Sequence, residues 1–153
     1  MRIVVQRVKK ASVTVDEKIV GKINHGLLLL VGFTHTDNID SIDYLVNKVL
    51  NLRIFDDENG IMNKSVLDVN GSILSVSQFT LYADTKKGNR PSYVDAMKGE
   101  KAIKLYEAFN NKLREKINVQ TGIFGAEMDV ELINDGPITI ILNNKEWFGW
   151  KKK

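Results

Sequence analysis

Apolar residues near the start of the chain predict a sheet. They dominate Ile3 to Val8, alternate with polar residues over Ser12 to Val15, and return at Ile19-Val20 after the polar pair Asp16-Glu17. This pattern is typical of strands joined by a hairpin. The next segment, Gly26 to Gly32, is apolar at successive positions, which predicts a strand that is buried on both faces.

Two later segments have the spacing of amphipathic helices. In the first, Asp37 or Asn38 can cap a helix with apolar positions at Ile42, Leu45, Val46 and Val49. The second covers roughly Lys98 to Ile117 and places Ala102, Tyr106, Phe109, Leu113 and Ile117 on one face. We expect both helices to pack on the sheet through these faces.

Turn signals divide the rest of the chain into further strands. Asn59-Gly60 and Asn70-Gly71 are strong turn dipeptides, and the second opens a predicted strand from Ser72 to about Tyr82. Alternating residues over Glu127 to Leu142 predict more strand, with Asn134 to Pro137 turning the chain. The fold class is therefore α+β, with a mostly antiparallel, curved or barrel-like sheet and two packed α-helices.

Composition narrows the possible chemistry. The 153 residues suit one domain, and no apolar run approaches a membrane span, so no membrane partner is expected. The chain has no cysteine and only two histidines, His25 and His35, so we expect neither a metal nor another cofactor. The first residues lack a secretory pattern, which favours the cytoplasm.

The whole net charge of +3 corresponds to Lys151, Lys152 and Lys153 at the end of the chain, since the remaining residues carry 19 basic and 19 acidic groups. A second basic cluster, formed by Lys86, Lys87 and Arg90, lies in a glycine-bearing segment. Such a cluster is compatible with contact to a phosphate backbone, but charge alone favours an ordinary solvated surface.

Three short motifs are candidates for chemistry. Ser77-Gln78-Phe79-Thr80 places two hydroxyls and an amide in an otherwise apolar run, which suits either a polar pocket wall or an ordinary alternating strand. Gly136-Pro137 suits a hairpin turn, or a close approach of backbone to ligand with a cis bond before the proline. Phe124-Gly125-Ala126 suits either a loop that stacks on a base or a core phenylalanine between turn glycines.

These motifs, taken together, resemble the D-aminoacyl-tRNA deacylase family, formerly called D-tyrosyl-tRNA deacylases. The resemblance runs from Met1 to about Leu142 and rests on several segments in family order: Met1 to Val8, Ala11 to Val15, Arg53-Ile54-Phe55, Met62-Asn63, Ser77 to Asp84, Lys87 to Ser92, Phe124 to Met128 and Asn134 to Pro137. Residues 1–142 would then form one deacylase domain. Residues 143–153, with Trp147, Phe148, Trp150 and three lysines, would form a C-terminal extension beyond it.

The resemblance implies an enzyme that hydrolyses the ester bond between a D-amino acid and tRNA, and that also removes mischarged glycine. It implies a homodimer in which Gly136 and Pro137, a cis-proline motif, complete the partner's site. There the two carbonyl oxygens would receive the substrate's α-amino group, and an L-side chain would clash. Arg7 would hold this motif through bonds to backbone carbonyls.

The same resemblance assigns roles around a pocket. Ser77, Gln78, Phe79 and Thr80 would line it, with backbone N–H groups of their strand polarising the ester carbonyl. Phe124 would stack on the adenine and Met128 would wall the pocket. Lys86, Lys87 and Arg90 would contact phosphates of the tRNA. The partner would be the 3′ acceptor end of aminoacyl-tRNA, and no DNA partner is expected.

The nucleophile would be either Thr80 or a water molecule assisted by the tRNA's terminal 2′-hydroxyl. The second is favoured, because the sequence supplies Thr80 with no evident base. Two other classes of protein remain as alternatives: a non-catalytic module that binds RNA acceptor ends, and an esterase for small substrates with a hydroxyl nucleophile.

Overall fold

The computed structural model describes residues 1–144. In chain order its elements are β1 (Arg2–Val15), β2 (Lys18–Ile23), β3 (Gly26–Gly32), α1 (Ile39–Asn51), β4 (Phe55–Asp56), β5 (Met62–Lys64), β6 (Ser72–Ser77), the 3-10 helix η1 (Phe79–Tyr82), α2 (Glu100–Arg114), β7 (Val119–Thr121) and β8 (Asp129–Asn143). The predicted strand Gly26 to Gly32 and the hairpin turn at Asp16-Glu17 are confirmed.

The main sheet is built around the long strand β1. Its first half pairs with β3, its second half pairs with β2, and β8 pairs antiparallel with β1 along almost its full length. Beyond β3 the order continues with β6 and β7, and these two pairings are parallel. The α+β class with a curved, nearly barrel-like sheet is confirmed; the sheet is mixed rather than purely antiparallel.

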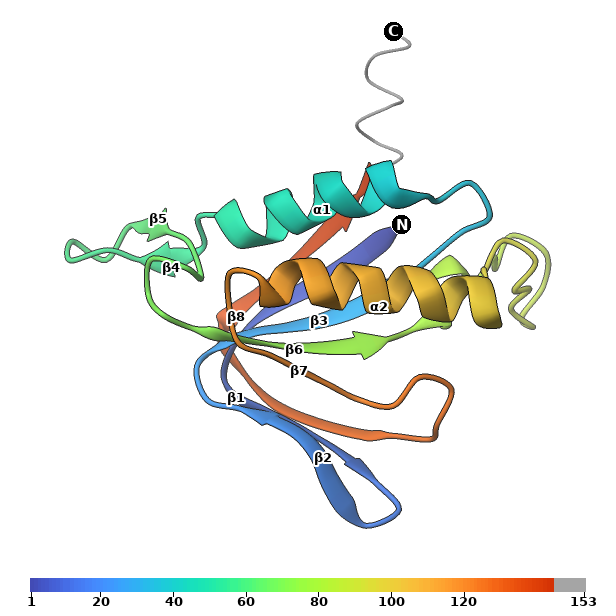
Figure 1. The fold of residues 1–153 in the computed structure, drawn as a ribbon, viewed down its shortest axis with the longest axis horizontal. Coiled ribbons are helices and arrows are strands. Elements are labelled where there is room, and N and C mark those ends of the chain that lie inside the picture. Colours follow the sequence, from blue (N-terminus) through green and yellow to red (C-terminus); the bar gives the residue numbers. More distant parts are fainter. Residues whose placement is uncertain (145–153) are drawn as a thin grey trace, which may run out of the picture.

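Helices α1 and α2 lie side by side on one face of the sheet (Figure 1). Asn38 caps α1 as one of the two predicted candidates, since its side chain accepts the N–H groups of Asp40 and Ser41. The predicted apolar face of α2 is buried at Ala102, Tyr106, Phe109 and Leu113. These residues join β1, β3 and α1 in one hydrophobic core, and α2 runs along β3 and β6 with its first turn at their carboxyl ends.

One predicted strand ends earlier than its hydrophobic pattern indicates. The expected strand from Ser72 to about Tyr82 stops at Ser77, and the chain enters η1 at Phe79. The parallel neighbour β3 ends at Gly32, immediately after Val31, which pairs with Ser77. A strand that has lost its neighbour also loses its ladder of hydrogen bonds. The prediction that Gln78, Phe79 and Thr80 lie within a strand is therefore wrong.

The segment Asn134 to Pro137 is the second correction, because it does not reverse the chain. Strand β8 pairs with β1 both before and after this segment. The register moves from Val8 opposite Asn134 to Gln6 opposite Thr139, so residues 135–138 have no partner on β1 in that register. The hairpin-turn interpretation of Gly136-Pro137 is wrong, and the dipeptide lies on a bulge within one long strand.

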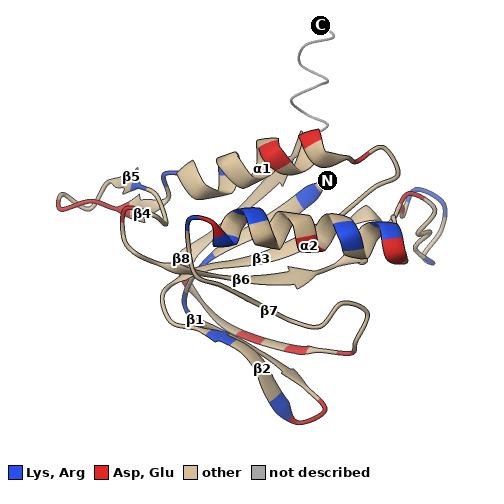
Figure 2. Ribbon diagram, in the orientation of Figure 1, with Lys and Arg blue, Asp and Glu red and all other residues tan. Residues whose placement is uncertain are grey.

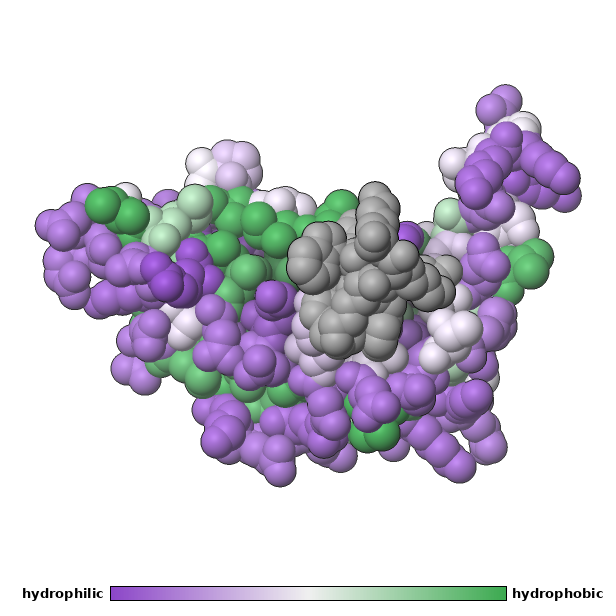
Figure 3. Space-filling view, turned by 90° about the horizontal axis from the view of Figure 1, so that it is seen from above, coloured by the Kyte–Doolittle hydropathy of each residue, from purple (hydrophilic) through white to green (hydrophobic). Residues whose placement is uncertain are grey.

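None of the described helices is both long and apolar enough to cross a membrane. Seen from above, the molecule has a hydrophobic band on this face, reaching inward from the end where β4 and β5 lie (Figure 3). Most of the predicted C-terminal extension lies outside the described residues. This part includes Trp147, Phe148, Trp150 and the terminal lysines.

Candidate active site

A pocket of about 390 Å³ opens where β3 and β6 end beneath the start of α2. Five of the predicted site residues line it: Ser77, Gln78, Phe79, Phe124 and Met128. They come from two segments more than forty positions apart, the end of β6 with η1 and the loop between β7 and β8. Most of the remaining wall is apolar, including Val31, Phe33 and Met97. This combination of an apolar cavity with a few polar groups is typical of a ligand site.

The polar corner of the pocket is held against β3. Gln78 donates its backbone N–H to the carbonyl oxygen of Val31 at 2.7 Å, so the chain stays attached to β3 as it leaves the sheet. Gly32 permits this approach, because a Cβ there would lie 2.9 Å from Gln78 O and 3.2 Å from Leu81 Cβ. The fold therefore presents Ser77 and Gln78 at a strand end with η1 directly behind them.

The first turn of η1 leaves two backbone donors without partners. Among the described residues, no acceptor is found for the N–H groups of Phe79 and Thr80. The N–H groups at the start of a helix have no partner within that helix. The available donors therefore belong to a 3-10 helix rather than to the predicted strand, and Gln78 N–H is already used.

Thr80 is the one residue of its motif that does not line the pocket. Its Oγ1 accepts a hydrogen bond from Gln78 Nε2. Within the described part of the chain, its hydroxyl contacts no histidine, carboxylate or lysine that could act as a base. This environment does not activate the hydroxyl as a nucleophile.

Tyr106 of α2 connects the two walls of the pocket from behind. Its hydroxyl donates to the carbonyl oxygen of Ser75 at 2.7 Å, and its ring lies 5.8 Å from the ring of Phe124, centroid to centroid. Burial raises the pKa of Tyr106, which keeps the hydroxyl neutral and able to donate. The sequence marked Tyr106 only as a core residue, because its helical spacing carries no signal for the pocket.

The Gly136-Pro137 peptide bond is cis, as the resemblance implied, and both residues are exposed. Arg7 holds the segment from β1, as expected: Nε donates to Asp135 O at 3.0 Å, and Nη1 donates to Ile54 O at 2.7 Å. Arg7 as a whole is 8% exposed, and its Nη1 also lies 3.7 Å from a carboxylate oxygen of Asp56. A buried charge needs partners of this kind, so Arg7 and the bulge stabilise each other.

Asn134 is a positioning residue that the sequence analysis did not single out. Its Oδ1 accepts the N–H of Ile138 at 2.8 Å, and its Nδ2 donates to Thr139 Oγ1 at 3.0 Å. The side chain thus spans Gly136-Pro137 and satisfies a backbone group that β1 does not reach. An asparagine just before Gly-Pro is a sequence signal for such a local bond, since Asn side chains commonly bond to nearby backbone.

Two predicted groups lie away from this pocket. Neither Gly136 nor Pro137 is among the residues that line it. Lys86, Lys87 and Arg90 are exposed on the loop before α2, where Figure 2 shows basic and acidic residues together. Lys87 and Arg90 line a separate hollow of about 320 Å³ with Asp84 and Asp95. Within the described residues, no group of three His, Cys, Asp or Glu side chains gathers as a metal site.

Known proteins match this chain over almost its full length. The family model for D-Tyr-tRNA(Tyr) deacylase matches residues 4–143. A protein of Geobacillus sp. (strain WCH70), named D-aminoacyl-tRNA deacylase, is 57% identical over 152 residues, which are 99% of this chain and 100% of that protein.

Two solved structures share the fold. One, named c-Myc DNA Unwinding Element Binding Protein, has a TM-score of 0.89 and 43% identity, covering 94% of this chain and 98% of that one. The other, described as a probable eukaryotic D-amino acid tRNA deacylase, has a TM-score of 0.79 at 18% identity, covering 92% of this chain and 97% of that one. At that identity the second shows the fold alone.

Proposed function

Because the chain belongs to the D-Tyr-tRNA(Tyr) deacylase family and is a hydrolase of the D-aminoacyl-tRNA ester bond, we propose that the pocket beneath α2 binds the terminal aminoacyl-adenosine. The observation that carries this proposal is that Ser77, Gln78 and Phe79 line one cavity together with Phe124 and Met128. The first segment supplies polar groups to the ester, and the second supplies apolar surface to the base.

The backbone N–H groups at the start of η1 are the proposed donors to the ester carbonyl: Phe79 itself lines the pocket, and the N–H of Thr80 follows it in the same turn. They are free among the described residues and are held by the short rigid turn of η1. Donors fixed in this way stabilise the charge that develops on the carbonyl oxygen, by about 3 kcal/mol each. Ser77 and Gln78 complete the polar corner.

A water molecule is the proposed nucleophile. Its oxygen bonds to the ester carbonyl carbon, the bond from that carbon to the ribose 3′ oxygen breaks, and the water proton passes to that oxygen by way of the 2′-hydroxyl. The surroundings of the Thr80 hydroxyl favour this route over attack by Thr80, because the hydroxyl accepts from Gln78 and, among the described residues, contacts no group that could act as its base. RNA rather than DNA is the proposed partner, because only a ribose carries the 2′-hydroxyl.

Phe124 is proposed to stack on the adenine, while Met128 closes the same side of the pocket. Stacking of a base on an aromatic ring contributes about 1–3 kcal/mol. Tyr106 holds Phe124 from behind, so this platform is preformed. Lys86, Lys87 and Arg90 are exposed on the loop before α2 and are proposed to contact phosphates of the acceptor stem.

Chirality is proposed to be set across two subunits of a homodimer. Gly136 and Pro137 are exposed on a bulge of β8 and do not line their own chain's pocket, so a second copy is needed to bring them to the ester. The same strand exposes Ile133 and Ile141, at 45% and 61%, and apolar surface of this kind is typical of interfaces. A D-side chain would pass the dipeptide, an L-side chain would clash, and glycine would be accepted.

We further propose that residues 1–142 act as a single deacylase domain, with residues 143–153 as an extension, and that the protein works in the cytoplasm. Family membership decides against the two alternatives considered from the sequence, a non-catalytic RNA-binding module and a small-substrate esterase.

Hydrolysis of matched substrates tests the proposed selectivity. We expect the purified protein to release D-tyrosine from D-tyrosyl-tRNA much faster than L-tyrosine from L-tyrosyl-tRNA, and to cleave glycyl-tRNA. Equal rates on the two tyrosyl-tRNAs would contradict the chiral filter.

Mixed dimers test the shared site. Chains carrying Gly136→Ala are mixed with chains carrying Phe124→Ala, and subunit exchange is verified with two differently tagged chains. Each mixed dimer then contains one site free of both changes, so activity should return above that of either parent. Verified mixed dimers without activity, made from folded dimeric parents, would contradict the model.

A further inference from the structure

Lys98 lies at the rim of the pocket, although the sequence around it indicated no functional role for this residue. It lies two residues before α2, separated from it by the N-cap Gly99, and is exposed, yet it lines the cavity beside Phe79 and Met97. Among the fifteen residues that line this cavity, Lys98 is the only one with a charged side chain. A ligand in the pocket therefore meets one positive charge, at one end.

Two aromatic rings fix the position of this charge. The Nζ atom of Lys98 lies 4.6 Å from the centroid of the Phe79 ring and 5.5 Å from that of Tyr93. The two rings pack edge to face at 5.1 Å, so they form one support. Cation–π contacts at such distances hold an ammonium group without neutralising it.

The ammonium group also has no acidic partner. Within residues 1–144, no carboxylate lies within ion-pair distance of Lys98 Nζ. The basic residues of the neighbouring loop differ in this respect, since Lys87 and Arg90 share their hollow with Asp84 and Asp95. Lys98 thus places a positive charge at the pocket rim, and among the described residues this charge has no acidic partner.

We propose that Lys98 binds the phosphodiester that joins the terminal adenosine to the preceding nucleotide. This inference rests on the proposed function, which places the adenosine and its ester in the pocket. The substrate carries a negative charge on this phosphodiester and a positive charge on the α-amino group of its amino acid. Lys98 attracts the first and repels the second, so it fixes which end of the substrate reaches Ser77 and Gln78.

Lys98 is accordingly a positioning residue for the substrate and takes no part in bond breaking. The contact to Phe79 gives it a second effect, because Phe79 also supplies one of the proposed donors to the ester carbonyl. A phosphate that binds Lys98 is therefore positioned relative to the same turn that binds the ester carbonyl of the substrate.

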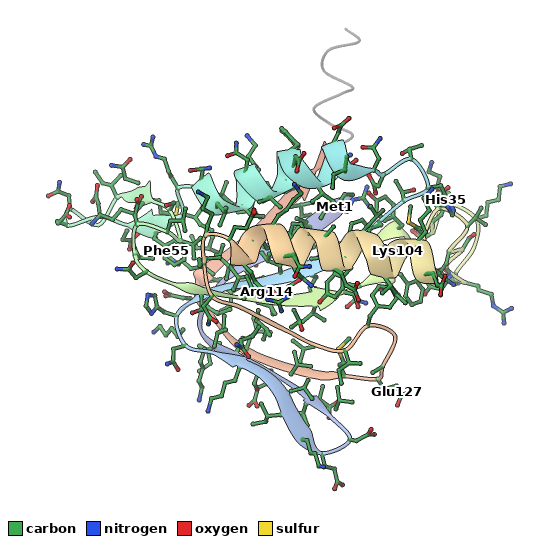
Figure 4. All side chains as sticks on the ribbon, viewed as in Figure 1. Met1, His35, Phe55, Lys104, Arg114 and Glu127 are labelled. Atoms are coloured by element: carbon green, nitrogen blue, oxygen red, sulfur yellow. The ribbon has the colours of Figure 1, made fainter. Side chains whose placement is uncertain are left out.

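The proposal is tested by a thermodynamic cycle in which the enzyme and the substrate are each changed, separately and together. One D-tyrosyl-tRNA carries the natural phosphodiester before its terminal adenosine, and a second carries an uncharged methylphosphonate there. The enzymes are the wild type, Lys98→Met, which retains an apolar stem over the rings, Lys98→Arg, which retains the charge, and Lys104→Ala. Lys104 is exposed on α2 and does not line the pocket, which makes it a matched control (Figure 4).

We expect Lys98→Met to lower kcat/KM about tenfold on the natural substrate, equivalent to about 1.4 kcal/mol. On the methylphosphonate substrate, Lys98→Met and wild type should be equal. Lys98→Arg should retain most of the preference for the charged substrate, and Lys104→Ala should behave as wild type. An equal loss on both substrates, or no loss on either, would overturn the proposal.

A binding measurement separates this inference from the proposed function. The dissociation constant of the dinucleotide CpA, in charged and methylphosphonate forms, needs no hydrolysis. Wild type should prefer the charged form and Lys98→Met should not. If this preference is present while D-tyrosyl-tRNA is not cleaved, the phosphate site stands and the proposed reaction fails. If D-tyrosyl-tRNA is cleaved but wild type does not prefer the charged dinucleotide, the proposed reaction stands and the phosphate site fails.

Discussion

Arg7 Nε lies 3.0 Å from the carbonyl oxygen of Asp135, the residue immediately before Gly136-Pro137. Through this bond β1 holds the bulge of β8, while Arg7 Nη1 bonds the carbonyl of Ile54 at the start of the β4–β5 segment. One buried guanidinium thus joins three parts of the chain at the bulge that carries Gly136-Pro137.

Replacing Arg7 with lysine should impair activity although the positive charge remains. An ammonium group has no planar fork, so it cannot donate to Asp135 and Ile54 in the same geometry. We expect a loss of stability of about 1.5–3 kcal/mol and a loss of D-tyrosyl-tRNA hydrolysis that exceeds the unfolded fraction. Urea unfolding and initial rates measure the two effects. Arg53→Lys is the matched control, since Arg53 is exposed and within residues 1–144 its side chain hydrogen-bonds only to Asn63; wild-type behaviour of Arg7→Lys would rule out the positioning role.

Gly136→Ala should damage both the bulge and the activity. The added Cβ would lie 2.6 Å from Ile138 Cγ1 and 3.0 Å from Ile138 N, at a backbone φ of +132° that side chains disfavour. We expect a loss of stability of more than about 1 kcal/mol, measured by thermal unfolding, together with low activity. Gly88→Ala separates strain from contact, because Gly88 also has a positive φ but, among the described residues, no atom lies within 4 Å of an added Cβ. Equal effects of the two changes would show that contacts at Gly136 are unimportant.

Thr80→Ala should retain substantial activity. The proposed donors are backbone groups, which the substitution keeps, and the proposed nucleophile is water. Loss of an obligate nucleophile would instead lower kcat by several orders of magnitude. Single-turnover hydrolysis of D-tyrosyl-tRNA is the measurement. An inactive variant that still folds and binds tRNA would favour attack by Thr80.

Tyr82→Phe should change stability only at alkaline pH. Burial raises the pKa of Tyr82, with the Asp37 charge adding to the shift and Arg2 opposing it. The unfolded chain therefore loses this proton first, near pH 10, so the free energy of unfolding falls as pH rises above that value. Among the described residues the hydroxyl has no hydrogen-bond partner, so its removal should cost little at pH 7. Urea unfolding at pH 7 and pH 11 should show a smaller alkaline loss in the variant; an unchanged loss would mean that Tyr82 does not titrate in this way.

The sequence by itself determined the elements whose cause is local. Asn38 caps α1 because its side chain reaches N–H groups two and three residues ahead, and that chemistry is readable from the sequence. The buried strand Gly26 to Gly32 and the core face of α2 follow in the same way from hydrophobic spacing. Resemblance to a family added Arg7 and Met128, whose positions no spacing indicates, and it favoured base stacking over a core role for Phe124.

Tertiary structure alone decided where the strands end and what Gly136-Pro137 does. Ser72 to Tyr82 remains apolar enough for a strand, but β3 ends beside Ser77 and leaves the continuation unpaired, so η1 forms and frees its backbone donors. Asn-Asp-Gly-Pro has the composition of a turn, yet β1 pairs on both sides of it and turns it into a bulge. Lys98 likewise gains a role only because its ammonium group lies over Phe79 and Tyr93 at the pocket rim. In each case the cause is a neighbour distant in sequence, and no local pattern contains it.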